Sequence, residues 1–383
     1  MKKRFKSSTE LAFILSGLIL LSGLLVYLHL LKPISTEYKW KEIRIPRGVT
    51  YSQGIDILKK EDIIKNDFIF LVLGRLTMTD TRLRAGYYNL NTSMTPWEVF
   101  NSIRKGTIVQ RAIILPEGSD LKDIKLKFLE AGLMDEDSWQ LVRDKDFLDS
   151  LDIDSPSLEG YLYPDTYNFA KGTNPDDIFR IMVHRLRQHF NQNLTEKMEE
   201  LGMNEREVLT LASIIEKEAL YDRERPIISA VYHNRLNKNM RLQADPTVVY
   251  GIKKMQDGIT RRDLKRATPY NTYVIYGLPP GPIASPGIES IKAALHPADV
   301  DYIYFVSKND GTHYFSTTGD EHLNAVMLYQ RNNRNTKTQS EPNPGNGPVT
   351  ESGHTDQTTI HTGSQGTDTN SEINVAGEKE KNN

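Results

Sequence analysis

The longest apolar stretch of the chain covers residues 11–31, where two serines, two glycines and one histidine interrupt the hydrophobic positions. At 1.5 Å per residue, a helix of this length spans about 30 Å, which matches the hydrocarbon core of a bilayer. A cleavable signal peptide is the alternative, but its apolar part is usually about 7–15 residues long and ends at a small-residue cleavage site. No such site follows residue 31, so the pattern predicts one retained transmembrane helix.

The charges that flank this stretch predict its orientation. Only Lys32 follows it directly, whereas four basic residues precede it, namely Lys2, Lys3, Arg4 and Lys6. Basic flanks of a membrane span stay on the cytoplasmic side. We therefore expect residues 1–10 in the cytoplasm, a single-pass anchor in the cytoplasmic (inner) membrane, and the rest of the chain on the extracytoplasmic side.

A helical period of hydrophobic positions is clearest at residues 205–220. Asn204 precedes the segment as the expected N-cap, and Glu207 stands three residues later in a capping pattern. Six apolar positions follow: Val208, Leu209, Leu211, Ala212, Ile214 and Ile215. The pattern predicts a largely buried helix that ends near Leu220.

The rest of residues 155–331 alternates between helical and strand patterns. Further helices are expected near residues 174–202, 225–238 and 287–295. Strands expected at residues 302–307 and 312–316 enclose the turn sequence Lys308-Asn309-Asp310-Gly311, which indicates a β-hairpin. The predicted class of this domain is α+β.

Residues 41–150 contain an internal repetition with an offset of 70 residues, in which Ile45-Pro46-x-Gly48 aligns with Leu115-Pro116-x-Gly118. Each copy has the pattern of a short strand, a Pro/Gly turn and two helices. The first copy closes with a strand at residues 86–90, and Thr95-Pro96-Trp97-Glu98 then forms a capping box for a helix that stops at Gly106. A small α+β module, in one or two copies, is therefore predicted within residues 36–150.

Composition limits the range of functions. The 48 basic and 50 acidic residues nearly balance, and no basic stripe is interleaved with aromatic residues, so we expect no nucleic-acid partner. The chain has no cysteine and its nine histidines are scattered, so we expect neither a metal site nor a cofactor. Residues 332–383 are polar and contain no aromatic residue or leucine, a composition typical of a disordered tail.

Two carboxylates end the otherwise apolar helix. Burial raises the pKa of a carboxyl group, as a general acid near neutral pH requires. At about 100° per residue, Glu216 and Glu218 point roughly 200° apart, so only one of them can line a given cleft. We favour Glu216 as the catalytic residue because Ala212 and Ser213 on its face leave room for a ligand. The alternative is a structural ion pair with an arginine such as Arg223, Arg225 or Arg235.

Several longer motifs accompany this helix. They are 159-EGYLYPDT-166, 231-VYHNRL-236, 240-MRLQADPTVVYG-251, 269-PYNTY-273 and 277-GLPPGPIASPG-287. Together with the glutamate segment, and in this order, they resemble the endolytic murein transglycosylases of the YceG-like family. The resemblance covers roughly residues 40–330. In that family the glutamate that matches Glu216 is catalytic.

The resemblance implies a fold and an activity. It implies an α+β fold with a LysM-like module before a catalytic domain at residues 155–331. It also implies cleavage of the MurNAc-GlcNAc β-1,4 bond within peptidoglycan glycan strands with 1,6-anhydro-MurNAc ends, termination of nascent glycan strands, and work beside peptidoglycan synthases. A muramidase that uses water is one alternative, for which only Asp165 and Asp245 offer a second motif carboxylate. A non-catalytic scaffold that binds the cell wall is another.

Polar residues in the turn-rich motifs are expected to contact the amino sugars, because amides and hydroxyls suit acetamido and hydroxyl groups. Turn or cap chemistry is the alternative role for Asp245-Pro246 and for Asn271-Thr272. The loop 277–287 is expected to form a rigid wall of the cleft. The candidate contacts are Glu218, Gln243, Asp245, Asn271, Tyr273 and Ser285, with His313 as an outer candidate.

Overall fold

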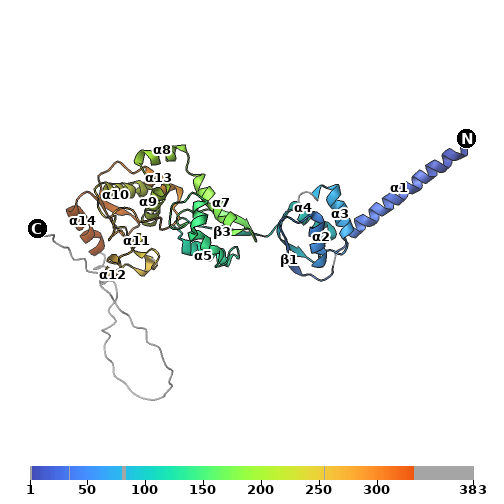
Figure 1. Ribbon diagram of the computed structural model, residues 1–383, viewed down its shortest axis with the longest axis horizontal. Helices are drawn as coiled ribbons and strands as arrows, with labels where there is room; N and C mark the ends of the chain where they lie inside the picture. Colours follow the sequence, from blue (N-terminus) through green and yellow to red (C-terminus); the bar gives the residue numbers. More distant parts are fainter. Residues whose placement is uncertain (1, 34, 80–82, 254, 332–383) are drawn as a thin grey trace, which may run out of the picture. The chain divides into compact units, whose positions relative to one another are not determined.

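The computed structural model describes residues 2–33, 35–79, 83–253 and 255–331. These residues form two compact units between which the chain passes repeatedly (Figure 1). Of the described residues, the first unit holds those up to Leu115, Lys122–Leu141 and Asp165–Met182, and the second holds Pro116–Leu121, Val142–Pro164 and those from Val183 to Arg331. The tail predicted at 332–383 lies outside the described residues.

The N-terminal apolar run forms the helix α1 (Lys2–Leu30). Its segment Glu10–Leu28 is long and apolar enough to cross a membrane, and none of it is buried within the protein. The helix is therefore compatible with a single-pass membrane anchor.

The first module has the predicted order of strand, two helices and strand. β1 (Trp40–Ile45) is followed by α2 (Tyr51–Lys60), α3 (Asp67–Leu76), β2 (Gly86–Asn91) and α4 (Pro96–Lys105). β1 and β2 pair antiparallel, with Trp40 opposite Asn91 and Ile45 opposite Gly86. The capping box at Thr95 and the stop at Gly106 are confirmed. Leu58, Tyr88 and Phe100 are among the fully buried core residues.

The repetition is visible in the backbone. α5 (Leu121–Glu130) begins and ends 70 residues after α2, and both Gly48 (φ 82°) and Gly118 (φ 74°) adopt the left-handed conformation in the preceding turn. β3 (Gln110–Ile114) and β4 (Thr166–Ala170) form an antiparallel pair. The second helix predicted for this copy is instead a 3₁₀ helix, η2 (Ser138–Arg143), and the short α6 (Lys145–Asp149). Asp144 accounts for the break because its side chain accepts the Phe147 N–H and begins a new helix.

The helix predicted at residues 174–202 is wrong as a single element. α7 (Pro175–Arg187) and α8 (Gln192–Leu201) are separate, because the side chain of Asn191 accepts the Leu194 N–H as a new N-cap. The helices predicted at 225–238 and 287–295 are confirmed as α10 (Arg225–Asn237) and α13 (Ile288–Leu295). The hairpin is also confirmed, with β5 (Tyr304–Ser307) paired with β6 (His313–Ser316). The remaining helices are η3 (Asp222–Glu224), α11 (Asp245–Val249), η4 (Met255–Asp257), α12 (Arg261–Leu264), α14 (Gly319–Val326) and the π-helix η5 (Met327–Arg331).

The helix α9 (Glu205–Glu218) lies among other helices of the second unit and contacts α10, α11 and α13 (Figure 1). Its predicted capping box is confirmed, with Asn204 and Glu207 exchanging hydrogen bonds. All residues from Val208 to Ile215 are buried. Because the helix is covered on every side, the side chains of its last turn also enter packed surroundings.

Candidate functional site

Glu216 and Glu218 stand in the last turn of α9, and their carboxyl groups meet different partners. Glu216 contacts groups from the start of α10 and the start of α13. Glu218 contacts groups from α10 and the start of α11. The predicted divergence of the two side chains is therefore confirmed, and each belongs to its own cluster.

The Glu216 carboxylate is enclosed by donors. Its Oε1 accepts a hydrogen bond from Arg225 Nη2 at 3.2 Å, and its Oε2 accepts from the Gly287 N–H at 3.0 Å and from Ser290 Oγ at 2.7 Å. The side chains of Glu216 and Arg225 are only 7% and 8% exposed. The arginine and the two further donors thus satisfy the hydrogen-bonding capacity of this buried carboxyl group. The predicted alternative, a structural ion pair with Arg225, describes this geometry.

The Glu218 carboxyl has no arginine bonded to it among the hydrogen bonds described for this part of the chain. The Tyr232 hydroxyl donates to Oε1 at 3.2 Å, and the backbone N–H of Asp245 also donates to the carboxyl group. Burial first, and then the negative charge of Asp245, raises the pKa of Glu218 to about 8. The residue as a whole is half-buried, as Glu216 also is. A carboxyl group whose pKa is raised in this way can act as a general acid near neutral pH.

Asp245 and its neighbours complete this second cluster. The carboxyl group of Asp245 accepts a hydrogen bond from the Tyr273 hydroxyl at 2.7 Å, and burial raises its pKa. The guanidinium of Arg235 donates to the carbonyls of Ile303 and Leu242, each at 2.7 Å, and its charge opposes part of the rise in the pKa of Glu218. Gln243 is exposed beside it, with Oε1 3.5 Å from Arg235 Nη1. Four predicted residues thus gather here: Glu218, Gln243, Asp245 and Tyr273.

The other predicted contact residues have different partners. The Asn271 side chain donates to the carbonyls of Asp263, Leu264 and Arg266 and is fully buried, which is the turn role proposed as its alternative. Ser285 is buried too, and its backbone bonds to the backbone of Gly118 and Ser119. His313 Nδ1 lies 2.8 Å from Glu224 Oε2, and the His313 N–H also bonds to that carboxylate. These bonds hold loops and the hairpin in place.

A third carboxyl group with a raised pKa was not predicted as functional. Glu159 is 2% exposed, and it accepts the Leu121 N–H at 3.1 Å and the Tyr250 hydroxyl at 2.8 Å. Burial raises its pKa to about 8. Because its bonds fix the start of α5 and the end of α11, Glu159 supports the loops around the Glu218 cluster. The motif 159-EGYLYPDT-166 marked this position without indicating its contacts.

Tyr232 was not predicted as a site residue, and Arg235 was predicted only as a possible ion-pair partner of the two glutamates. Both lie in the motif 231-VYHNRL-236 on α10, and their spacing of three residues places them on one face of the helix. Neither residue type alone distinguishes a site from a packed core. Only the packing of α10 against α9, which turns the face with Tyr232 and Arg235 toward Glu218, identifies these two residues as part of the cluster.

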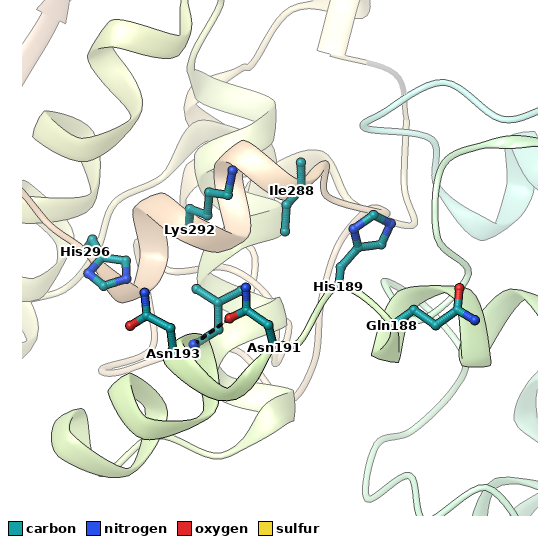
Figure 2. A pocket seen from close by; sticks show the side chains of 8 residues that line it. Gln188, His189, Asn191, Asn193, Ile288, Lys292 and His296 are labelled. Atoms are coloured by element: carbon teal, nitrogen blue, oxygen red, sulfur yellow. Dashed lines mark hydrogen bonds between the residues drawn. The ribbon is translucent and has the colours of Figure 1, made fainter.

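A hollow of about 470 Å³, lined by both polar and apolar side chains, lies between α8 and α13 (Figure 2). In Figure 2, Ile288, Lys292 and His296 follow one side of α13, with Asn191 and Asn193 at the start of α8 opposite them. Ser290, which bonds to Glu216, is two residues from Ile288 and so points away from this side. None of the lining residues was predicted from the sequence.

Comparisons with known proteins agree on one family. The model of the YceG-like family matches residues 43–327. The chain is 33% identical over 330 residues to the endolytic murein transglycosylase of Bacillus subtilis (strain 168), across 81% of this chain and 91% of that protein. It is 29% identical over 354 residues to the endolytic murein transglycosylase of Streptococcus pneumoniae serotype 2 (strain D39 / NCTC 7466), and there the match covers 64% of the relative.

A solved structure is similar as well. The crystal structure of a yceG-like protein from Listeria monocytogenes is 34% identical in sequence, with a TM-score of 0.52. The superposed region covers 76% of this chain and 100% of that chain.

Proposed function

The chain belongs to the YceG-like family, and from this premise we propose that it is a lytic transglycosylase which cleaves peptidoglycan glycan strands internally. The bond we propose is the MurNAc-GlcNAc β-1,4 linkage, with 1,6-anhydro-MurNAc as the new end. The names of the bacillar and streptococcal relatives support the reaction class. The observation within this chain that carries the proposal is the Glu218 cluster, in which the Tyr232 hydroxyl and the Asp245 N–H bond to a carboxyl group whose pKa is raised by burial.

We assign the proton donor to Glu218 rather than to the predicted Glu216. Glu216 accepts hydrogen bonds from Arg225, Ser290 and the Gly287 N–H, so the protonated form that a proton donor requires would give up its ion pair with Arg225. Glu218 has a pKa of about 8 and needs no rearrangement to act as an acid. The Glu216 assignment stays a prediction, and the electrostatics favour its neighbour.

One acid is enough for the reaction. Glu218 donates its proton to the glycosidic oxygen as the bond to C1 of MurNAc breaks, and the GlcNAc-containing strand leaves as an alcohol. The C6 hydroxyl of the same MurNAc then attacks the oxocarbenium-like C1, and the Glu218 carboxylate takes the hydroxyl proton. The acid is regenerated and an anhydro ring is formed. The high effective concentration of an intramolecular hydroxyl replaces an activated water.

Asp245 supports a second candidate reaction. Hydrolytic glycosidases use two carboxyl groups, and Asp245 places a second one beside Glu218. In the proposed transglycosylase, an ionised Asp245 stabilises the positive charge that develops at C1. In a muramidase, it would activate a water instead. The non-catalytic scaffold is less favoured because burying a carboxyl group without a cationic partner costs stability and serves no evident structural purpose at Glu218.

The products distinguish these reactions. We propose to digest purified glycan strands with the protein and to analyse the new ends by mass spectrometry. Muramyl ends lighter by one water than hydrolytic ends are expected for the transglycosylase. Reducing muramic acid ends as the main product would show that the protein is a muramidase and not a transglycosylase. Intact strands would favour the non-catalytic scaffold.

The remaining proposals concern location and context. We propose that α1 anchors the protein in the cytoplasmic membrane with residues 1–10 in the cytoplasm, and that the catalytic domain at residues 155–331 acts outside. The strand–helix–helix–strand order supports a LysM-like module within residues 36–150. Peptidoglycan synthases are the proposed neighbours, and termination of nascent strands is the proposed role. If cells that express the full chain yield a soluble envelope protein shortened at its N-terminus, the proposed anchor is contradicted.

A further inference from the structure

The outer face of α3 is apolar although nothing in the described part of the first module covers it. Phe68, Leu71, Val72 and Leu76 recur at helical spacing, and all are exposed, with Phe68 at 69% and Leu76 at 75%. Met78, just beyond the helix, is 70% exposed. The opposite face is buried through Phe70 and Gly74. A helix that is apolar on both faces is typical of one that is covered on its second side as well.

The start of α3 lies beside the end of the proposed membrane span. A cavity of about 180 Å³ is lined by Lys32 and Pro33, which directly follow α1, and by Asn66, Ile69 and Phe70 at the beginning of α3. α1 also contacts α4, and the Ser35 N–H donates to the carbonyl of Thr92 at 3.0 Å. The segment between the span and the module is therefore short and bonded to the module, so it cannot act as a long spacer.

The side chains around this junction are those that lipid interfaces favour. Tyr38 (69% exposed) and Trp40 (51%) stand within ten residues of the end of α1, and Trp97 (42%) opens α4 next to Pro96, which lines the same cavity. Lys32 and Lys65 are exposed at its rim. Tyrosine and tryptophan rings settle at the headgroup level, and lysine extends toward lipid phosphates.

We propose that the exposed face of α3, formed by Phe68, Leu71, Val72 and Leu76, docks on the outer surface of the membrane that anchors the chain. This inference rests on the proposed anchor. The occupant is lipid rather than protein because α3 begins beside the end of the span, where exposed aromatic and basic residues also stand. Burial of an apolar helix face in the headgroup region holds the helix parallel to the bilayer. The first module then lies against the membrane instead of extending from it.

The chain offers a direct test because it has no cysteine. Full-length protein in liposomes would carry a single cysteine with a fluorescent label at Val72, at Leu20 in the span, or at Asp56, which is exposed on α2 of the same module. Each label would be quenched in separate samples by nitroxide lipids and by aqueous iodide. Val72→Cys is expected to be quenched severalfold more by the lipids than Asp56→Cys, and less by iodide.

Equal quenching at Val72 and Asp56 would overturn the docking, even though Leu20→Cys stays lipid-quenched and so preserves the anchor. Protection of Val72 from both quenchers would also overturn it, because protein would then cover the face. Label-to-label energy transfer between copies would identify that protein as a second copy of the chain. Loss of lipid quenching at Leu20 would contradict the proposed anchor and therefore also the proposed docking.

Discussion

The carboxyl groups of Glu216 and Glu218, both in the last turn of α9, have opposite surroundings. On one side, Glu216 meets Arg225, Ser290 and a backbone N–H, which together stabilise its charge. On the other, Glu218 meets a tyrosine hydroxyl and one backbone N–H beside another carboxyl group, and its pKa rises to about 8. Two residues of separation are enough for this contrast because they rotate a side chain by roughly 200°. We propose that the first side stabilises the fold and that the second supplies the proton for catalysis.

The largest expected effect is on catalysis. Glu218→Gln keeps the shape but removes the proton, so glycan cleavage should fall by about 10²–10⁴-fold, the usual contribution of a general acid. Glu216→Gln is the matched control two residues away. It should lose melting temperature but keep cleavage per folded molecule, whereas Glu218→Gln should not lose stability. An active Glu218→Gln enzyme together with a folded but inactive Glu216→Gln enzyme would reverse the assignment.

The next effect concerns the stability of the ion-paired side. Arg225→Ala leaves the Glu216 carboxylate buried without its cation, which should cost about 3–5 kcal/mol of unfolding free energy. Arg223→Ala, at an exposed neighbouring arginine, should change it by less than about 0.5 kcal/mol. Chemical denaturation of both variants measures the difference. Equal, small losses would mean that Glu216 does not depend on Arg225.

The sequence predicted this site incompletely for a definite physical reason. The period of the helix and the N-cap at Asn204 are local properties, and they correctly indicated a buried α9 with two diverging carboxyl groups. Which carboxyl group meets an arginine depends on how α10 and α13 pack against α9. Small neighbours such as Ala212 and Ser213 suggested an open face at Glu216, but Arg225, from the following helix, occupies that side.

The secondary structure shows the same difference between what local signals predict and what they do not. The first module could be predicted as strand, two helices and strand because each turn carries its own Pro/Gly or capping signal. The region 174–202 was predicted as one helix because apolar spacing continues across Asn191, where the side-chain cap starts α8. Gln243 and Tyr273 were predicted from their motifs to contact the substrate, and packing places them beside Arg235 and Asp245 in the Glu218 cluster. Asn271 comes from the same motif as Tyr273, yet its contacts are within its own loop.

A third buried carboxyl group tests how far burial alone explains the contrast. The pKa of Glu159 is about 8 in the folded protein against 4.5 for the free group, so the folded state binds more protons than the unfolded state. Its stability contribution is present below pH 4.5 and is lost as the pH rises toward 8. Between pH 4.5 and 7 the loss is on the order of 3 kcal/mol.

Glu159→Gln cannot ionise and should flatten this part of the stability curve. Unfolding free energies measured from pH 5 to pH 8 for both proteins provide the comparison. Parallel curves would show that Glu159 does not hold a proton in the folded state.

A smaller effect should sharpen the role of Asp245. Its charge raises the pKa of Glu218, so Asp245→Asn should lower that pKa. The protonated acid would then be lost at a lower pH, and the alkaline limb of the cleavage profile should move toward acid. The profile of cleavage rate against pH measures this shift, whatever the change in the maximal rate. If the alkaline limb of the profile does not move, the charge of Asp245 does not affect the pKa of Glu218.

The most direct measurement is the titration of Glu218 itself, by NMR of protein carrying ¹³C-labelled glutamate carboxyl groups. The resonance assigned to Glu218 is the one that is absent from the Glu218→Gln variant. We expect its pKa to be near 8, far above the usual value of 4.5 for a glutamate. A Glu218 carboxyl group that titrates near that usual value would already be ionised at neutral pH and would contradict its role as the proton donor.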